Sequence, residues 1–273
     1  MSLWARLSRL WLPLYAALYL IFLYLPVLLL PLFSVNASAV PALPLTGLTL
    51  DWYRSLAGND AMQHAAWNSL IVALASAVLA TVLGICAARA ITRYRFAGQK
   101  PMSALIMAPL VLPEIIIAVA LLIVVLQIGL DLSLVTVMLG HVLICLPYAI
   151  TVLVSGFEGF DPAYEEASAD LGETAFGTLR RVTLPMMAPA IVASLLVAFT
   201  ISLDEFVLAF FLGGTEPTLP VYIWGQLRFA ARLPAVLALG TLMLLLSLLL
   251  LTLAEALRRR AASRVAPKGD LFA

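Results

Sequence analysis

Residues 161–185 read DPAYEEASADLGETAFGTLRRVTLP, a polar segment in a chain that is 63% hydrophobic and only 11% charged. Residues 158–173 hold six of the 15 acidic residues of the whole chain. Soluble domains carry about 25% charged residues, and a mean hydropathy of +1.07 is too high for a chain that buries its apolar residues in one soluble core. The composition therefore predicts a membrane protein, in which residues 161–185 form a distinct polar part.

The apolar sequence on both sides of this segment forms six stretches, each long enough to cross about 30 Å of hydrocarbon at roughly 1.5 Å per residue. We place the spans near residues 11–34, 66–89, 102–129, 133–155, 187–212 and 234–257. The apolar run Trp11–Phe33 exceeds the core of about 7–15 residues of a signal peptide, so we expect it to be retained. The sequence predicts an all-α polytopic protein, with an N-terminal segment at 1–10, one transmembrane domain at 11–257 and a basic tail at 258–273.

The basic residues are distributed unevenly between the two sides of these spans. All except Arg54, Arg228 and Arg232 fall in the two terminal segments or in the connections at 89–100 and 156–186. Because cytoplasmic loops carry an excess of Lys and Arg, we expect both termini and residues 161–185 to be cytoplasmic. A net charge of +1 gives no indication of a nucleic-acid partner, and Cys86 and Cys145 lie in apolar runs, which argues against a disulfide.

The polar segment itself has the pattern of a short helical hairpin. Asp161 followed by Pro162 is typical of a helix start, and Pro185 closes the segment before the fifth span. Gly172 interrupts the pattern, either by turning the chain or by allowing another backbone to approach closely. One apolar stripe recurs every three or four residues: Tyr164, Ala167, Leu171, Ala175 and Leu179. The segment is too short and too acidic to bind an anionic membrane surface, so we expect a protein partner.

Glu166-Ala167-Ser168, Gly172 and Val182-Thr183-Leu184-Pro185 have the spacing of a known signature. They resemble the EAA motif of ATP-binding cassette (ABC) importer permeases, with Ser168 in place of alanine and Val182 in place of isoleucine. The resemblance implies a type I ABC importer permease fold, in which residues 161–185 form a coupling helix region that docks on a cytoplasmic ATPase. The docking residues that it implies are Glu166, Ala167, Ser168, Gly172, Leu184 and Pro185.

Further short motifs between residues 60 and 257 resemble one subfamily, the second permease subunit of spermidine/putrescine importers. They are WNSL at 67–70, RYRF at 93–96, LPEII at 112–116, GFD at 159–161 and SLDEF at 202–206. The resemblance implies a bacterial inner-membrane location, a dimer of ATP-binding subunits and a second, different permease subunit. It also implies a periplasmic binding protein that delivers a polyamine such as putrescine or spermidine, for which we expect residues 213–233 to be the dock.

Three acidic residues lie inside the predicted spans: Glu114 near the middle of the third, and Asp204 and Glu205 toward the outer half of the fifth. A carboxylate in hydrocarbon costs several kcal/mol and normally faces a cavity or a partner. No Lys or Arg lies well inside a span, so we expect these acids to be unpaired within this chain and to line a path for a cationic substrate. The alternatives are that some are protonated or bonded to a partner subunit. Pro113, directly before Glu114, marks either a cation-coordinating bend or an ordinary packing kink.

The sequence contains no G-x-x-x-x-G-K-S/T phosphate-binding loop and no set of residues typical of hydrolysis. We therefore expect a non-catalytic subunit that binds no cofactor, with ATP and magnesium on the partner ATPase. We expect no metal site, and a structural role for His64 and His141. Three alternatives remain open: an ABC permease for another small organic solute, an ion-driven carrier or channel, and an intramembrane enzyme using Glu114 and Asp204.

Overall fold

The computed structural model describes the backbone of residues 3–265 and the side chains of residues 11 and 13–253. Of the predicted terminal segments, residues 1–2 and 266–273 lie outside the described residues. The described chain is helical, and its strand-like pairing is limited to one antiparallel bridge between Asn36 and Leu48. The predicted all-α class is confirmed.

The chain divides into two compact units. The first unit holds the chain up to Asp60 and Ile223–Leu246; the second holds Ala61–Tyr222 and the chain from Ser247. Helices that belong wholly or partly to the first unit are α1 (Leu3–Ser34), α2 (Asp51–Ala57), the 3-10 helix η3 (Ala230–Arg232) and α12 (Leu233–Val265). Helices of the second unit are α3 (Asp60–Arg93), α4 (Gln99–Met107), the 3-10 helix η1 (Ala108–Leu110), α5 (Glu114–Gln127), α6 (Leu134–Glu158), α7 (Ala163–Asp170), α8 (Ala175–Thr178), the π-helical turn η2 (Leu179–Thr183), α9 (Leu184–Asp204), α10 (Val207–Leu212) and the first part of α11 (Leu219–Gln226).

In the first unit, α1 is apolar on all sides. Its stretch Pro13–Ser34 contains a window of 18 residues with a mean hydropathy of 2.4, none of which is buried within the chain. A helix that is apolar all round is typical of a membrane span that faces lipid or a partner. At its end, the Ser34 hydroxyl lies 2.6 Å from that of Tyr53, and the Trp52 indole donates to the Asn36 carbonyl at 2.8 Å, so α2 is tied to this end of α1.

Five described helices are long and apolar enough to cross a membrane, and a sixth candidate is the pair Gln99–Leu110 and Glu114–Gln127, which bends by 105°. The predicted span near 102–129 thus corresponds to this bent pair of helices. Pro109 lies within η1 and Pro113 caps α5 with an extended backbone (ψ 129). Because a proline lacks the N–H and disfavours a helical residue before it, the helix ends and restarts here.

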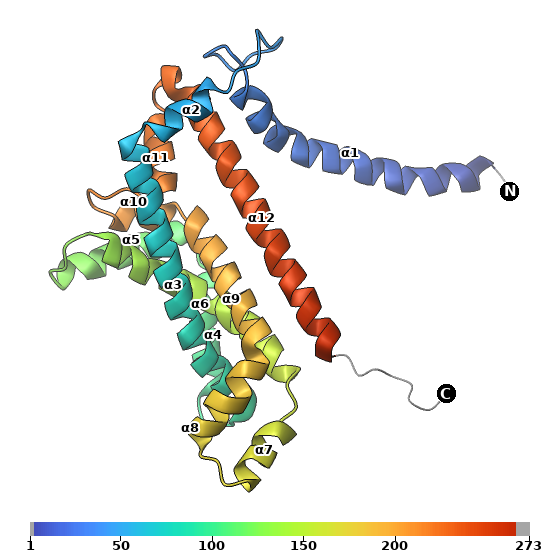
Figure 1. Ribbon diagram of the computed structural model, residues 1–273, viewed down its shortest axis with the longest axis vertical. Coiled ribbons are helices and arrows are strands. Elements are labelled where there is room, and N and C mark those ends of the chain that lie inside the picture. Colours follow the sequence, from blue (N-terminus) through green and yellow to red (C-terminus); the bar gives the residue numbers. More distant parts are fainter. Residues whose placement is uncertain (1–2, 266–273) are drawn as a thin grey trace. The chain divides into compact units, whose positions relative to one another are not determined.

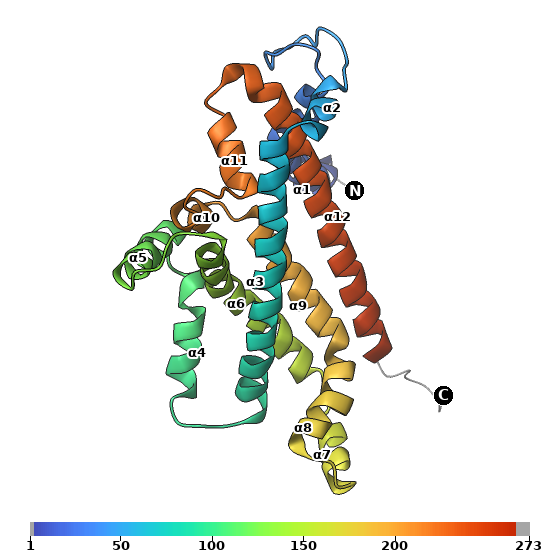
Figure 2. The same ribbon diagram turned by 60° about the vertical axis from the view of Figure 1, so that its left-hand side comes forward.

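The core of the second unit is built from small residues that bring α3, α6 and α9 close together, as both views of the ribbon show (Figures 1 and 2). Buried positions on α3 recur every three or four residues, so one face is covered along its length. A Cβ on Gly84 would lie 3.0 Å from Leu153 and 3.3 Å from Ala149 of α6, and one on Gly156 would lie 2.6 Å from Ala190 of α9. Such close backbone contacts are characteristic of membrane helices, whose association depends on van der Waals packing.

The predicted fifth span, 187–212, is longer at its start and broken near its end. Residues 175–204 form one helical stretch that includes α8, η2 and α9. The helix stops at Asp204, Glu205 has an extended backbone (ψ 125), and α10 follows. At the other end of the stretch, α7 and α8 form the tip of the second unit, beyond the start of α9 (Figure 2).

Candidate functional site

The segment 161–185, called here the coupling hairpin, begins and turns as its sequence indicates. The Asp161 carboxylate accepts the Ala163 amide at 2.9 Å, and α7 begins at Ala163. Gly172 has a positive φ of +85°, and a Cβ at this position would have no neighbour within 4 Å, so the glycine serves to turn the chain rather than to admit another backbone. The Thr174 hydroxyl accepts the Gly177 amide at 3.1 Å and starts α8.

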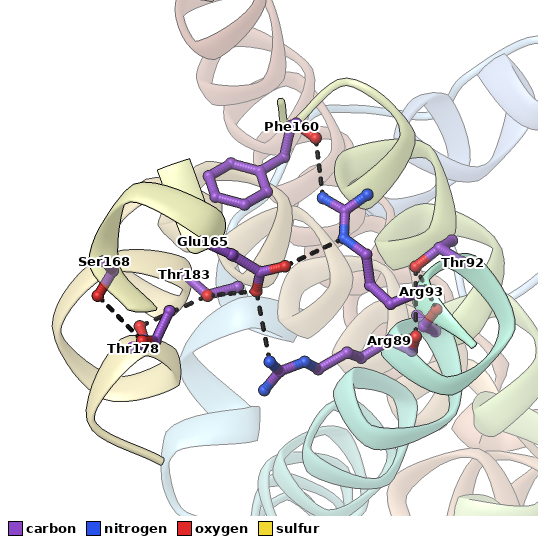
Figure 3. A network of polar contacts seen from close by, with 9 residues as sticks. Arg89, Thr92, Arg93, Phe160, Glu165, Ser168, Thr178 and Thr183 are labelled. Carbon is purple, nitrogen blue, oxygen red and sulfur yellow. Dashed lines mark hydrogen bonds and ion pairs between the residues drawn. The ribbon is translucent and has the colours of Figure 1, made fainter. Parts of the chain in front are cut away.

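Glu165 fixes α7 to the end of α3 (Figure 3). Its carboxylate lies 3.5 Å from Arg89 Nη2 and 3.2 Å from Arg93 Nε, and it accepts the Thr183 hydroxyl at 2.7 Å. The Nε of Arg93 is off the hydrogen-bond direction and its contact with Glu165 is ionic, whereas Nη2 of the same guanidinium donates to the Phe160 carbonyl at 2.8 Å. The three charged side chains are 15–19% exposed, so this contact is screened less than one at the open surface.

This contact was not predicted from the sequence, where the basic residues of the connection at 89–100 indicated the orientation, RYRF at 93–96 a subfamily resemblance, and Glu165 had no assigned role. A signal was present: arginines four residues apart lie on one face of a helix, and both precede an acidic hairpin on the same predicted side. Within the hairpin, the hydroxyls of Ser168 and Thr178 lie 2.9 Å apart and join α7 to α8.

The opposite side of the hairpin exposes apolar side chains. Leu171 is 90% exposed, Phe176 73% and Tyr164 53%. A groove of about 460 Å³ includes two of them, Tyr164 and Leu171. Its lining residues are Tyr164, Ala167, Ser168, Leu171, Gly172, Glu173, Arg181 and Val182. Arg181 and Glu173 form an ion pair of 2.6 Å at its edge. Exposed apolar side chains grouped around a groove and rimmed by charge are typical of a protein-binding surface.

The six residues implied by the EAA resemblance occupy different positions on the hairpin. Glu166 and Ala167 are exposed on α7, and Ser168 is half-buried against Thr178. Gly172 forms the turn, Leu184 is half-buried in the first turn of α9, and Pro185 is exposed beside it. The surface available to a partner is thus contributed mainly by α7 and the turn, while Leu184 and Pro185 begin the span.

The structure places the predicted pathway acids in three different environments. Glu114 is exposed at the first position of α5, directly after the 105° bend. Asp204 is exposed at the last position of α9, where its carboxylate accepts the Ser247 hydroxyl at a long 3.4 Å. Among the described residues, neither carboxylate takes part in an ion pair.

Glu205 corrects the expectation that all three acids are unpaired in this chain. Its side chain is 4% exposed, and its Oε2 lies 3.0 Å from Nε2 of His141, which is 1% exposed. Its two oxygens accept the amides of Leu208 and Ala209 at 2.8 and 3.1 Å. The prediction failed because it considered only Lys and Arg as partners and treated His141 as an isolated residue.

No group of three His, Cys, Asp or Glu residues that could hold a metal ion occurs in the part of the chain whose side chains are described. In the predicted outer dock, Trp224 is 50% exposed and Leu227 45% exposed. These apolar side chains are available for contact, and the binding role of residues 213–233 stays a prediction.

Comparisons with known proteins agree with this architecture. Residues 80–263 match the family described as binding-protein-dependent transport system inner membrane component. The chain is 36% identical over 240 residues to the spermidine/putrescine transport system permease protein PotC of Haemophilus influenzae, covering 88% of this chain and 93% of the relative. It is also 36% identical over 231 residues to the putrescine transport system permease protein PotI of Escherichia coli K12, covering 82% of each.

Solved structures show the same fold at lower sequence identity. A chain of a bacterial ABC transporter involved in the import of the acidic polysaccharide alginate superposes with a TM-score of 0.69 at 21% identity, covering 94% of this chain and 98% of the other. A chain of the MetNI methionine ABC transporter in inward-facing conformations superposes with a TM-score of 0.61 at 16% identity, covering 78% and 99%.

Proposed function

The chain belongs to the family of binding-protein-dependent transport system inner membrane components, and from this premise we propose that it is a permease subunit of an ABC importer for polyamines. Its relatives PotC and PotI are named for spermidine/putrescine and putrescine transport, and they match it over more than 80% of its length. The identity to both relatives extends beyond the hairpin to the spans that carry Glu114 and Asp204. This identity is the observation that carries the proposed cargo class.

The coupling hairpin is the proposed dock for a cytoplasmic ATP-binding subunit. Its outer side offers an apolar groove and exposed Leu171, while its inner side is bonded through Glu165 to Arg89 and Arg93 of α3. A segment that binds a partner on one side and is held to a span by ion pairs on the other can transmit a movement of the partner to that span. ATP and magnesium would then be bound by the partner, and this chain would be non-catalytic.

The remaining subunits and the orientation follow from the same proposal. The excess of Lys and Arg in the connections on the hairpin side supports a cytoplasmic location for that side and for both termini. A periplasmic binding protein would meet the outer segment 213–233. The largely exposed stretch Pro13–Ser34 of α1 and the apolar faces of the other spans provide surface for lipid and for a second permease subunit of different sequence.

Cation selectivity is proposed to come from Glu114 and Asp204, which are exposed and without an ion-pair partner among the described residues. A carboxylate attracts an ammonium group more strongly where water is scarce. A diamine or triamine that passes both residues would therefore be favoured over a neutral or anionic solute.

The test is cargo-stimulated ATP hydrolysis and uptake by the complete complex reconstituted in liposomes with its binding protein. Putrescine and spermidine are compared with neutral and anionic solutes of similar size. We expect only the polyamines to stimulate hydrolysis and to accumulate inside. Stimulation by the neutral or anionic solutes alone would refute the polyamine assignment, and uptake by this chain without ATPase subunits would indicate an ion-driven carrier.

A further inference from the structure

A buried polar cluster lies in the membrane-spanning part of the second unit, away from the coupling hairpin. His141 of α6 is its centre: Nδ1 lies 2.7 Å from the Ser202 hydroxyl of α9, and Nε2 lies 3.0 Å from Oε2 of Glu205. Nε2 is off the hydrogen-bond direction, so the contact with Glu205 is a close electrostatic approach. Glu205 is therefore buried against the imidazole ring and does not face an open path.

Glu205 also starts α10. Its Oε1 accepts the Leu208 amide and its Oε2 accepts the Ala209 amide, two N–H groups that have no partner within so short a helix. Hydrogen bonds to an ionised acceptor are stronger than neutral ones. The same carboxylate therefore fixes the beginning of α10 and joins it to α6 through His141.

The rest of α10 is held on α6 by independent contacts. The Thr136 hydroxyl donates to the Leu212 carbonyl at the last position of α10, at 2.8 Å. Between the two ends, a Cβ on Gly140 would lie 2.8 Å from a methyl group of Leu212 and 2.9 Å from one of Leu208, so α10 packs closely on α6 where position 140 has no side chain. α10 is thus fixed to α6 at both its ends, by Thr136, Gly140 and His141, which lie within two turns of α6.

This attachment decides where Asp204 points. The chain leaves α9 at Asp204 and turns at Glu205, so the two neighbouring carboxylates separate: one is buried against His141, and the other is exposed. We infer that His141 and Glu205 are positioning residues of the transport path, which hold the break of the fifth span on α6 and so direct Asp204 to the open surface without contacting the cargo themselves. The inference rests on the proposed transport function.

Transport kinetics separate a positioning role from a cargo-binding role. Glu205→Gln, His141→Gln and the double variant are compared with Asp204→Asn in the reconstituted complex, with rates normalised to the amount of assembled complex. Because Asp204 is then no longer held at the open surface, we expect Glu205→Gln and His141→Gln each to raise the half-saturating polyamine concentration about tenfold, in the same direction as Asp204→Asn. Added to Asp204→Asn, either substitution should raise that concentration no further.

The double variant and a second site test the coupling. If the two residues act through one contact, the double variant should be no more impaired than the more severe single variant. Thr136→Val removes the bond at the far end of α10, together with the capping bonds between Thr136 and Ser133 at the start of α6. It leaves the buried carboxylate in place and should raise the half-saturating concentration in the same way. Asp131→Asn, at an exposed carboxylate in the loop before α6, is the matched control and should behave as the unmodified complex.

A second readout needs no cargo. In a background with Cys86→Ala and Cys145→Ala, the thiol of Asp204→Cys is labelled with a cationic thiosulfonate reagent. Adding Glu205→Gln or His141→Gln should lower the labelling rate about tenfold, because position 204 is no longer held at the surface. If the unmodified complex imports no polyamine, the proposed cargo is wrong, and this labelling still decides the positioning role.

Three results would overturn the inference. One is a further rise of the half-saturating concentration when Glu205→Gln is added to Asp204→Asn, since Glu205 would then contact cargo itself. The second is single-variant losses that multiply in the double variant. The third is a labelling rate at position 204 that stays within twofold in both variants.

Discussion

Replacing Glu165 by glutamine should release α7 from α3. It should also uncouple ATP hydrolysis from import, so that less polyamine is imported per ATP hydrolysed. The carboxylate is 15% exposed and contacts Arg89, Arg93 and Thr183 at 3.5, 3.2 and 2.7 Å. Glutamine keeps an oxygen that can accept the Thr183 hydroxyl but removes the charge that holds both arginines.

The size of the effect follows from these contacts. An exposed ion pair contributes about 0.2–1 kcal/mol and breaking a buried one costs about 3–5 kcal/mol, and the partly buried contacts of Glu165 lie between these limits. Since the amide retains part of the Thr183 bond, we expect a loss of about 2 kcal/mol, which corresponds to roughly a 30-fold shift toward released α7. Glu165→Ala, which removes all three contacts, should have a larger effect.

Hydrogen–deuterium exchange of the reconstituted complex measures this shift directly. We expect exchange of the α7 amides to rise about 30-fold in Glu165→Gln, with the core amides of α6 and α9 unchanged. Polyamine import per ATP hydrolysed should fall in parallel. Glu158→Gln, at an exposed carboxylate where α6 ends, is the matched control. Unchanged α7 exchange together with an unchanged import ratio would refute the role of Glu165 as the link.

Other changes probe the hairpin surface and the path. Leu171→Asp places a charge on a side chain that is 90% exposed, so it should weaken copurification of the ATPase subunit at least tenfold without lowering the melting temperature of this chain. Undiminished copurification would contradict the proposed docking surface. Gly172→Val forces a β-branched residue to a φ of +85°, which costs about 1–3 kcal/mol of backbone strain. It should uncouple ATP hydrolysis from import while the spans stay folded, and normal transport would exclude a role for this turn. Glu114→Gln should raise the half-saturating polyamine concentration, measured by uptake, and a value equal to that of the unmodified complex would remove Glu114 from the path.

The hairpin and the spans were predictable because they depend on local patterns. Asp161, Gly172 and the apolar stripe act through backbone geometry within a few residues, and long apolar stretches predict spans from composition alone. The contacts of Glu165 and Glu205 were not predictable in the same way. Each joins helices that lie far apart in the sequence, so their partners depend on tertiary packing.

The pathway acids show the same limit in one dipeptide. Asp204 and Glu205 have similar chemistry and lie in the same apolar stretch, and only the end of α9 between them separates an exposed carboxylate from a buried one. The kink around Pro113 was indicated by its sequence, since proline interrupts a helix locally. Its angle of 105° depends on packing of α5 against other elements.

The π-helical turn Leu179–Thr183, within the coupling hairpin, joins α8 to α9, and the Leu184 amide donates to the Leu179 carbonyl five residues earlier. Such a turn accommodates one residue more than an α-helical turn, and one residue corresponds to about 100° around a helix axis. The extra residue therefore sets the rotational phase between the hairpin and the span. Deleting one residue here would restore a regular ladder of backbone hydrogen bonds. It would also rotate the docking groove about 100° away from its present direction. The span would then be fully hydrogen-bonded, but the hairpin would turn a different face toward the ATP-binding subunit.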